Sequence, residues 1–393
     1  MMTLAATVAA AKPKLQIPAE LSAAPGIPCN VFFARALDSV KPSNYAFEAI
    51  SEAGNFWEDR WTWMPKGEDA GRRVRVVFNV WDDDGLVDAV TTTVRVARMP
   101  TDAQKARRVT VAILSASCTN SLFQDQLRNR LVEAGFTNYF AVGSHSGFSA
   151  SSVCEPEKHA PHDGYGGFCW GDFLTRYTMT VDEINNEQAE AERDQLVHLF
   201  ATKIPEGQEW RKALLRSPLV RRDGTNKVVD VQAWFDKINN GKAPDYVFIT
   251  LGGNGIATIR PERIDEAIAR QMASATSLLR ILRVAAPEMK IVVTSAFGGS
   301  ILQDGWGKNY GALTSAFVGN RNRIRYDREI EKLVAAMKDP NILYMTASLN
   351  VDPVGAYPHG KHANALHSTA EGGQQFGDAL ASWLIHDIET MSE

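Results

Sequence analysis

Residues 109–120 read VTVAILSASCTN, and this stretch decides the fold class. Its first half, Val109–Leu114, is short, apolar and β-branched, as expected of a strand buried on both faces. The residues that follow, Ser121–Ala134, place leucines on one side and end at Gly135, which is typical of an amphipathic helix with a glycine stop. A buried strand that leads straight into such a helix is the building unit of an α/β domain.

The same alternation continues towards the end of the chain. Further buried strands are expected at Tyr139–Val142, Tyr246–Leu251, Ile291–Thr294 and Ile342–Met345. Long helices are expected at 261–286, with proline in the first turn, and at 370–388. The sequence therefore predicts an α/β domain over residues 109–393, with a parallel sheet covered by helices on both faces.

The region 25–98 has a different pattern, with short strands separated by turns. Apolar residues alternate with polar ones from Arg73 to Val80, and Asp82-Asp83-Asp84-Gly85 supplies the chemistry of a tight hairpin turn. A return strand follows over Val90–Val96. With Trp57, Trp61 and Trp63 as core aromatics, the region is predicted to be a small all-β sandwich of the Ig-like type. The polar segment 99–108 is predicted to be a linker.

The first residues, Met1–Ala11, read MMTLAATVAAA. They resemble the second half of a secretory signal peptide that lacks its basic start, and a frayed N-terminus is the alternative. We therefore expect residues 1–24 to be a signal remnant or a flexible N-terminus. A signal remnant implies a secreted or periplasmic protein; otherwise a cytoplasmic one is expected.

The composition excludes several classes of protein. The 393 residues carry a net charge of −4, with 42 Lys and Arg against 46 Asp and Glu. Nucleic acids and anionic membranes need a positive patch on their partner, so no nucleic-acid partner is expected. No run reaches roughly 18 apolar residues, so no integral membrane segment is expected. Four cysteines without a C-x-x-C pair favour neither a disulfide scaffold nor a zinc knuckle.

Candidate reactive residues follow the predicted strands, where open parallel sheets collect them. Ser117 comes after the first strand, although Ser117 or Asn120 would also cap a helix. Asn254, within the Gly-Gly-Asn-Gly of 252–255, offers a neutral amide donor, or else serves an ordinary glycine turn. His367 precedes the last helix, where it could act as a general base.

The order of these residues resembles that of the SGNH (GDSL-type) hydrolases. The blocks HDGYGGFCWGDFL (162–174), APDYVFITLGGN (243–254) and ALHSTAEGGQQFGDAL (365–380) resemble blocks of that family, and the resemblance covers about Val109 to Ile388. It implies a flavodoxin-like three-layer α/β/α domain with an accessory β-sandwich in front. It also implies a nucleophile at Ser117, a base at His367, and an oxyanion hole at Asn254 and Gly167, with Gly166 an alternative by spacing.

Three acids of the family pattern are absent. The GDS motif reads Ser115-Ala116-Ser117, the G-x-N-D motif ends in Gly255, and the D-x-x-H motif begins with Asn364, where the triad acid would stand. In a serine protease, Asn in place of that acid costs about 10⁴ in rate. The resemblance therefore implies a Ser–His dyad or a relaxed triad that includes Asn364. The alternative is a catalytically impaired protein that binds carbohydrate.

The predicted function is hydrolysis of small acyl esters, acetyl esters in particular, on a small molecule or a glycan. Two loops, 144–180 and 297–320, are rich in aromatics such as Trp170, Trp306 and Tyr310, which would stack on sugars or else be buried. No cofactor is expected, and no metal, because His159 and His162 alone do not make a site. Three further residues have open roles: Cys154 and Cys169 would pair in an exported protein, and Cys118 fits a small buried residue better than a second nucleophile.

Overall fold

The computed structural model describes residues 12–149, 154–176, 217–223, 226–311 and 314–390. Its central element is a seven-stranded sheet in the order β10-β11-β8-β14-β15-β16, with β9 also paired to β8. All its pairs are parallel except β10 with β11. The strands are β8 (Val109–Ser115), β9 (Tyr139–Val142), β10 (His145–Ser146), β11 (Pro161–Gly164), β14 (Tyr246–Thr250), β15 (Lys290–Thr294) and β16 (Ile342–Met345). The five predicted strands are thus confirmed, with bounds within one residue.

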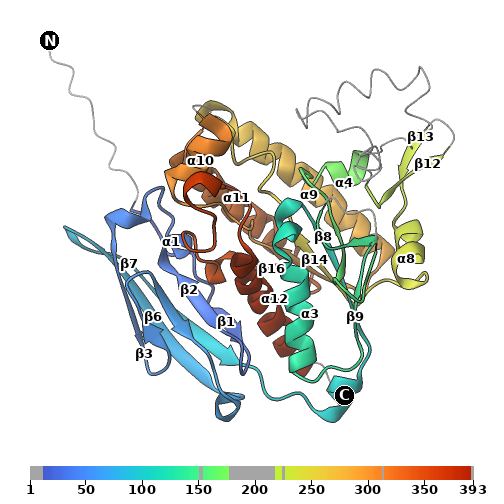
Figure 1. The fold of residues 1–393 in the computed structure, drawn as a ribbon, viewed down its shortest axis with the longest axis horizontal. Helices are drawn as coiled ribbons and strands as arrows, with labels where there is room; N and C mark the ends of the chain where they lie inside the picture. The colour runs from blue at the N-terminus through green and yellow to red at the C-terminus, as the bar shows by residue number, and fades with distance from the viewer. Residues whose placement is uncertain (1–11, 150–153, 177–216, 224–225, 312–313, 391–393) are drawn as a thin grey trace.

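Helices cover both faces of this sheet, as Figure 1 shows. On one face, α8 (Val231–Asn239), α9 (Ile264–Ala285) and α11 (Ala316–Met337) share a core cluster with β8, β14 and β15. On the other face, α3 (Phe123–Glu133) and α12 (Ala370–Thr390) form a second cluster with the same strands. The mixed α/β architecture predicted from the alternating pattern is confirmed. The remaining elements here are α4 (Asp172–Thr175), α10 (Gln303–Tyr310) and the hairpin of β12 (Val220–Asp223) and β13 (Asn226–Val229).

Two small sheets make up the N-terminal region. One has the order β1-β7-β6-β3 and the other the order β2-β5-β4, and both contribute to one hydrophobic cluster that contains Val31, Trp61 and Phe78. The elements are β1 (Glu20–Ala23), β2 (Cys29–Phe32), α1 (Phe33–Ala36), β3 (Ala46–Ser51), β4 (Asn55–Phe56), β5 (Arg60–Trp63), β6 (Arg73–Asp82) and β7 (Gly85–Val96). The predicted turn joins β6 to β7, and Gly85 has the positive φ of 127° expected of it. The Ig-like sandwich stays a prediction.

Two sequence-based expectations for this region were wrong. Residues 12–24 are not a flexible start, because β1 pairs in parallel with β7 and Leu15 and Ile17 are buried. Trp57 is 54% exposed and does not belong to the core that holds Trp61. The linker contains a short helix, α2 (Asp102–Ala106), whose first turn is capped by Thr101 through the backbone N–H of Gln104. The signal-like residues 1–11 lie outside the described residues.

The N-terminal region is joined to the α/β region by side chains that reach across. The buried Arg35 of α1 donates to the hydroxyl of Tyr357 and to the carbonyl of Val351. Asn350 accepts the backbone N–H of Asn30 at 2.6 Å. Figure 1 shows β1 and β2 lying beside α12 at this junction. Because these buried polar groups pair across the junction, the two regions fit together as one body.

Candidate active site

Ser117 lies where β8 ends, at the carboxyl edge of the parallel sheet. It begins a short 3₁₀ helix, Ser117–Ser121, and Leu122 then adopts a left-handed φ of 60° before α3 starts. Ser115, buried at the end of β8, donates its hydroxyl to the carbonyl of Thr250 on β14, which ties the two strand ends together. The turn therefore presents the Ser117 side chain at a fixed place beside the end of β14.

His367 lies three residues before α12 and faces Ser117. Its Nε2 atom is 2.9 Å from the Ser117 Oγ atom, a hydrogen-bonding distance. The surrounding protein partly removes the ring from water, which lowers its pKa from the usual 6.5. A histidine that stays neutral at neutral pH can accept a proton from a serine hydroxyl, so the pair has the geometry of a nucleophile and its base.

Among the described residues, Asn364 makes no hydrogen bond to this ring. Its Oδ1 atom accepts the backbone N–H groups of Leu366 at 3.0 Å and of His367 at 2.8 Å. Asp352, a carboxylate nearby in sequence, accepts the N–H groups of Val354 and Gly355 instead. Within the described ranges, no group is hydrogen-bonded to the Nδ1 atom of His367. Asn364 thus shapes the turn that carries the histidine, and its place in a relaxed triad stays a prediction.

Asn254 and the glycine block come together after β14 and β11. The Nδ2 atom of Asn254 donates to the carbonyl of Phe168 at 3.2 Å, next to Gly167. Gly167 has a φ of 79°, a conformation that favours glycine. The N–H groups of Tyr165 and Phe168 are bonded to the carbonyls of Ser115 and Tyr165. No hydrogen bond occupies the N–H groups of Gly166 or Gly167 in the part of the chain described, so both remain candidate oxyanion donors.

A network of buried hydrogen bonds around His162 lies next to the serine turn. His162 accepts the N–H of Gly164 at its Nδ1 atom and lies 2.8 Å from the carbonyl of Gly147 through Nε2. Because Nδ1 accepts, the proton is on Nε2, and the neutral ring has both nitrogens paired. Burial lowers the pKa of His162 to about 3. The segment 147–149, which holds the Gly147 carbonyl, is also hydrogen-bonded to the serine turn, because Asn120 accepts the N–H of Ser149.

Asp163 lies within this network and is fully buried. It accepts the hydroxyl of Tyr165 at 2.8 Å and the indole N–H of Trp234 at 2.9 Å. The sequence placed the His162-Asp163-Gly164 run in the glycine block but did not reveal its supporting role. The sequence carries no signal for this role, because an Asp-Gly pair is equally typical of an exposed turn.

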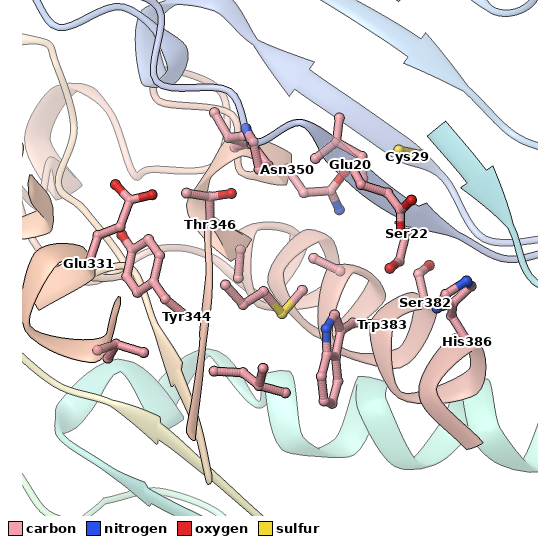
Figure 2. A pocket seen from close by; sticks show the side chains of 18 of the residues that line it. Glu20, Ser22, Cys29, Glu331, Tyr344, Thr346, Asn350, Ser382, Trp383 and His386 are labelled. Atoms are coloured by element: carbon pink, nitrogen blue, oxygen red, sulfur yellow. The ribbon is translucent and has the colours of Figure 1, made fainter. Parts of the chain in front are cut away.

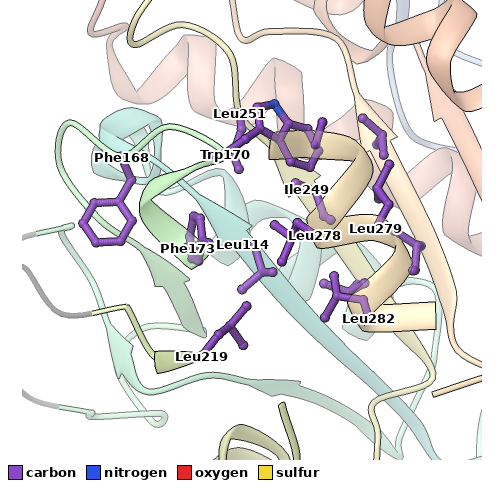
Figure 3. Close-up of a cluster of buried hydrophobic side chains, with 14 of the residues drawn as sticks. Leu114, Phe168, Trp170, Phe173, Leu219, Ile249, Leu251, Leu278, Leu279 and Leu282 are labelled. Atoms are coloured by element: carbon purple, nitrogen blue, oxygen red, sulfur yellow. The ribbon is translucent and has the colours of Figure 1, made fainter. Parts of the chain in front are cut away.

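The loop tryptophans are not a sugar-binding surface. Trp170 is fully buried in the cluster that Figure 3 shows, which also contains Phe168 and Phe173, and its indole N–H donates to the Tyr326 hydroxyl. Trp306 is 2% exposed and donates to the Ser300 carbonyl. Of the three predicted aromatics, only Tyr310 is partly exposed. For Trp170 and Trp306 the structure therefore confirms the alternative interpretation, that the loop aromatics are buried.

The remaining candidates are accounted for as follows. All four cysteines are free thiols, so the suggested pairing of Cys154 with Cys169 is absent. Burial raises the pKa of the Cys118 thiol, which does not favour a second nucleophile. His159 pairs with Asp125 at 2.6 Å. Among the described residues there is no group of three metal-ligating side chains, and none of the helices is long and apolar enough to cross a membrane.

In comparisons with known proteins, the chain is similar to solved structures only. No family model and no curated protein matches the chain. A carbohydrate esterase of family 3 from Talaromyces cellulolyticus is 15% identical, with 72% of this chain and 100% of that chain covered and a TM-score of 0.42. The family 3 carbohydrate esterase of Clostridium thermocellum is 13% identical, with coverages of 72% and 98% and a TM-score of 0.39.

A longer part of the chain is similar to a third structure. The family 2 carbohydrate esterase of Corynascus thermopiles, which includes a carbohydrate-binding domain, is 11% identical, with 93% of this chain and 91% of that chain covered and a TM-score of 0.37. These three structures are named as carbohydrate esterases of family 2 or 3.

Proposed function

We propose that this protein is a serine esterase of the SGNH type that hydrolyses small acyl esters, acetyl esters on carbohydrate in particular. The observation that carries the proposal is the 2.9 Å contact between Ser117 Oγ and His367 Nε2 at the end of β8. Parallel sheets gather reactive groups at this edge. A hydroxyl paired with a neutral imidazole is the arrangement that activates serine for attack on an ester carbonyl.

The reaction would run in two steps. His367 takes the hydroxyl proton of Ser117 as Oγ bonds to the ester carbonyl carbon, and then gives that proton to the leaving alcohol, which leaves an acyl-serine. Water then attacks the acyl-serine with His367 again as base, which releases the acid and restores the hydroxyl. Asn254 and the N–H of Gly167 or Gly166 would hold the oxyanion, a contribution of roughly 2.7–4 kcal/mol for one donor.

The carbohydrate part of the proposal rests on an exposed aromatic side chain beside the serine turn. Phe148 is 56% exposed and lies between Gly147 and Ser149, two residues whose backbones are bonded to Gln124 and Asn120. An apolar ring in that place gives a sugar ring a flat surface to lie on. The low net charge of −4 suits a neutral substrate, which needs no electrostatic attraction.

The deciding experiment measures acetate release from p-nitrophenyl acetate and from acetylated xylo-oligosaccharides. Wild type should turn over both, and Ser117→Ala and His367→Ala should lose about 10³-fold or more in kcat. Cys118→Ala is the matched control, because it changes the adjacent side chain and should keep its activity. Equal background rates in all four proteins would reject the esterase and leave the rival function, carbohydrate binding without turnover.

A further inference from the structure

A cavity of about 690 Å³ lies at the junction between the N-terminal strands and the α/β region. It is bounded by β1 and β2 on one side and by α12, β16 and the end of α11 on the other, as Figure 2 shows. None of Ser117, His367, Asn254 and Gly167 lines it. Its volume falls within the range of small-molecule sites, roughly 300–1,000 Å³. It is therefore a second site candidate, separate from the serine.

One buried hydroxyl in this cavity has no partner. Ser382 of α12 is 2% exposed, and its Oγ atom makes no hydrogen bond within the described residues. Figure 2 shows Ser382 and His386 projecting from α12 on the side that faces β1, whereas the ring of Trp383 lies against Tyr246 and Phe248 of β14. A buried hydroxyl without a partner is costly, because it has given up its bonds to water. A ligand with a hydroxyl group would supply the missing bond.

The other polar groups around the cavity are mostly neutral. Ser22, Asn30, Thr346 and Asn350 contribute hydroxyl and amide groups. Desolvation lowers the pKa of His386, so its ring is neutral at pH 7 and offers one donor and one acceptor.

Charged side chains also line the cavity, and two of the acidic ones form ion pairs with arginines. Glu20 is paired with Arg73 and Arg95, and Asp339 with Arg283. The two others are opposite in charge: Glu331 lies in the last two turns of α11, and Lys338 follows the end of that helix. A lining of this kind favours a neutral ligand with many hydroxyl groups over an ion.

An extended peptide is a poorer fit than such a ligand. The cavity runs along β16, an edge strand whose other side pairs with β15. The carbonyls of Asn341 and Met345 bond to β15, so by alternation Ile342 and Tyr344 point the other way. The N–H of Ile342 is already bonded to Asp339. Tyr344 alone then offers both a donor and an acceptor, which is too little for a strand ladder.

We propose that this junction cavity binds a short neutral oligosaccharide, with Ser382 hydrogen-bonded to a sugar hydroxyl and Trp383 against a sugar ring. Trp383 also lines the cavity and is half-buried, with its ring edge-on to Tyr246 and Phe248, so that part of an aromatic side chain stays accessible there. This site does not depend on the proposed esterase activity. It would hold a glycan chain at a point away from the reacting ester.

The test is calorimetric titration of the full chain with xylotetraose, cellotetraose and mannotetraose, none of which carries an ester. At least one should bind. Ser382→Ala should weaken that binding about three- to tenfold, the effect of one lost hydrogen bond. Ala379→Phe, which fills the cavity from α12, should abolish it. Ser117→Ala should bind as wild type does, so a failed esterase and a failed glycan site give different results.

The opposite outcomes would overturn the proposal. In the first, wild type binds none of the three sugars. In the second, wild type binds a sugar, but neither Ser382→Ala nor Ala379→Phe changes that binding. A decapeptide of alternating Thr and Val tests the rival ligand, an extended peptide. If the decapeptide binds and the sugars do not, the cavity is a groove that docks a strand and the proposal is wrong. Ser277→Ala on the exposed side of α9 is the control for Ser382→Ala. Thermal melting shows that each variant is folded.

Discussion

The Nε2 atom of His367 lies 2.9 Å from the Oγ atom of Ser117, although the two residues are 250 positions apart in the chain. Only a neutral imidazole can take the serine proton, and desolvation lowers the pKa of His367 from 6.5. The ring therefore stays neutral to a lower pH than a free histidine does. We expect the acid limb of kcat/KM to have its midpoint below pH 6.5, with a plateau at neutral pH. A pH profile on p-nitrophenyl acetate, corrected with Ser117→Ala, measures it, and a midpoint above pH 7 would contradict the role of His367.

Asn254 should contribute to the rate and little to substrate binding. Asn254→Asp keeps the shape but replaces the amide donor with a charged acceptor, which also faces the Phe168 carbonyl. We expect kcat to fall by about 10²–10³ with KM changed little, as for other oxyanion donors. The matched control is Asn120→Asp, because Asn120 accepts from Ser149 through its oxygen and an aspartate can do the same. A similar loss in both variants would mean that added charge, and not the lost donor, slows the reaction.

The sequence predicted the pairing of Ser117 with His367 through the resemblance of its motifs to those of the SGNH hydrolases, and it predicted the nearness of Ser117 and Asn254 from a general rule. Carboxyl ends of parallel strands meet at one edge, so residues that follow β8 and β14 must lie near each other whatever their separation in the chain. The strands were equally readable, since β8 and β14 are continuous apolar runs that end in turn residues. These features depend on local patterns, which a single sequence carries.

Other features depend on what each residue meets in the folded chain. Asn364 aligns with a triad acid by spacing, but its oxygen is used by the backbone of its own turn. Trp170 and Trp306 lie in loop sequences, and nothing in their neighbours along the chain says that they point inward. The four-residue strand β1 is too short to be recognised without its partner β7, which lies about 70 residues further on. His162 looks like any loop histidine until its two backbone partners are known.

Substitutions of Asn364 distinguish two roles for this residue, that of a triad member and that of a residue that only shapes the turn. In Asn364→Asp both backbone N–H groups keep an acceptor, so we expect kcat within a few-fold of wild type. Asn364→Ala loses two hydrogen bonds of about 1 kcal/mol each, and the displaced histidine should lower kcat roughly tenfold. Steady-state rates on p-nitrophenyl acetate compare the two. A hundredfold gain in Asn364→Asp would instead mean that the side chain reaches the imidazole and completes a triad.

Phe148 should affect sugar substrates and leave a simple ester unaffected. Its ring is exposed and makes no part of the core, so Phe148→Ala should fold normally. We expect KM for acetylated xylo-oligosaccharides to rise about three- to tenfold, with unchanged constants on p-nitrophenyl acetate. Phe317→Ala, which removes another exposed phenylalanine on α11, is the control. Equal constants for Phe148→Ala and wild type on the oligosaccharides would remove the reason for placing a sugar there.

The buried His162 should make folding stability depend on acid. Burial lowers its pKa in the folded protein to about 3, whereas in the unfolded chain the pKa is near its ordinary value of 6.5. Above pH 6.5 both states leave the ring neutral. Between pH 6.5 and 3 the unfolded chain binds a proton that the folded protein does not. This one residue should therefore lower the free energy of unfolding by about 1.4 kcal/mol for each unit of falling pH.

His162→Gln tests this linkage, because glutamine does not titrate and can still donate to Gly147 and accept from Gly164. The variant is expected to be less stable at pH 7, and its stability should then fall more slowly on acidification than that of wild type. Urea unfolding at pH 6.5, 5.5 and 4.5 should show the gap between the two proteins closing by about 1.4 kcal/mol per pH unit. His359→Gln, at an exposed histidine, is the matched control and should follow wild type. Parallel curves for wild type and His162→Gln would show that His162 is protonated in the folded protein, so that the hydrogen bond from Gly164 to Nδ1 is not what holds the serine turn.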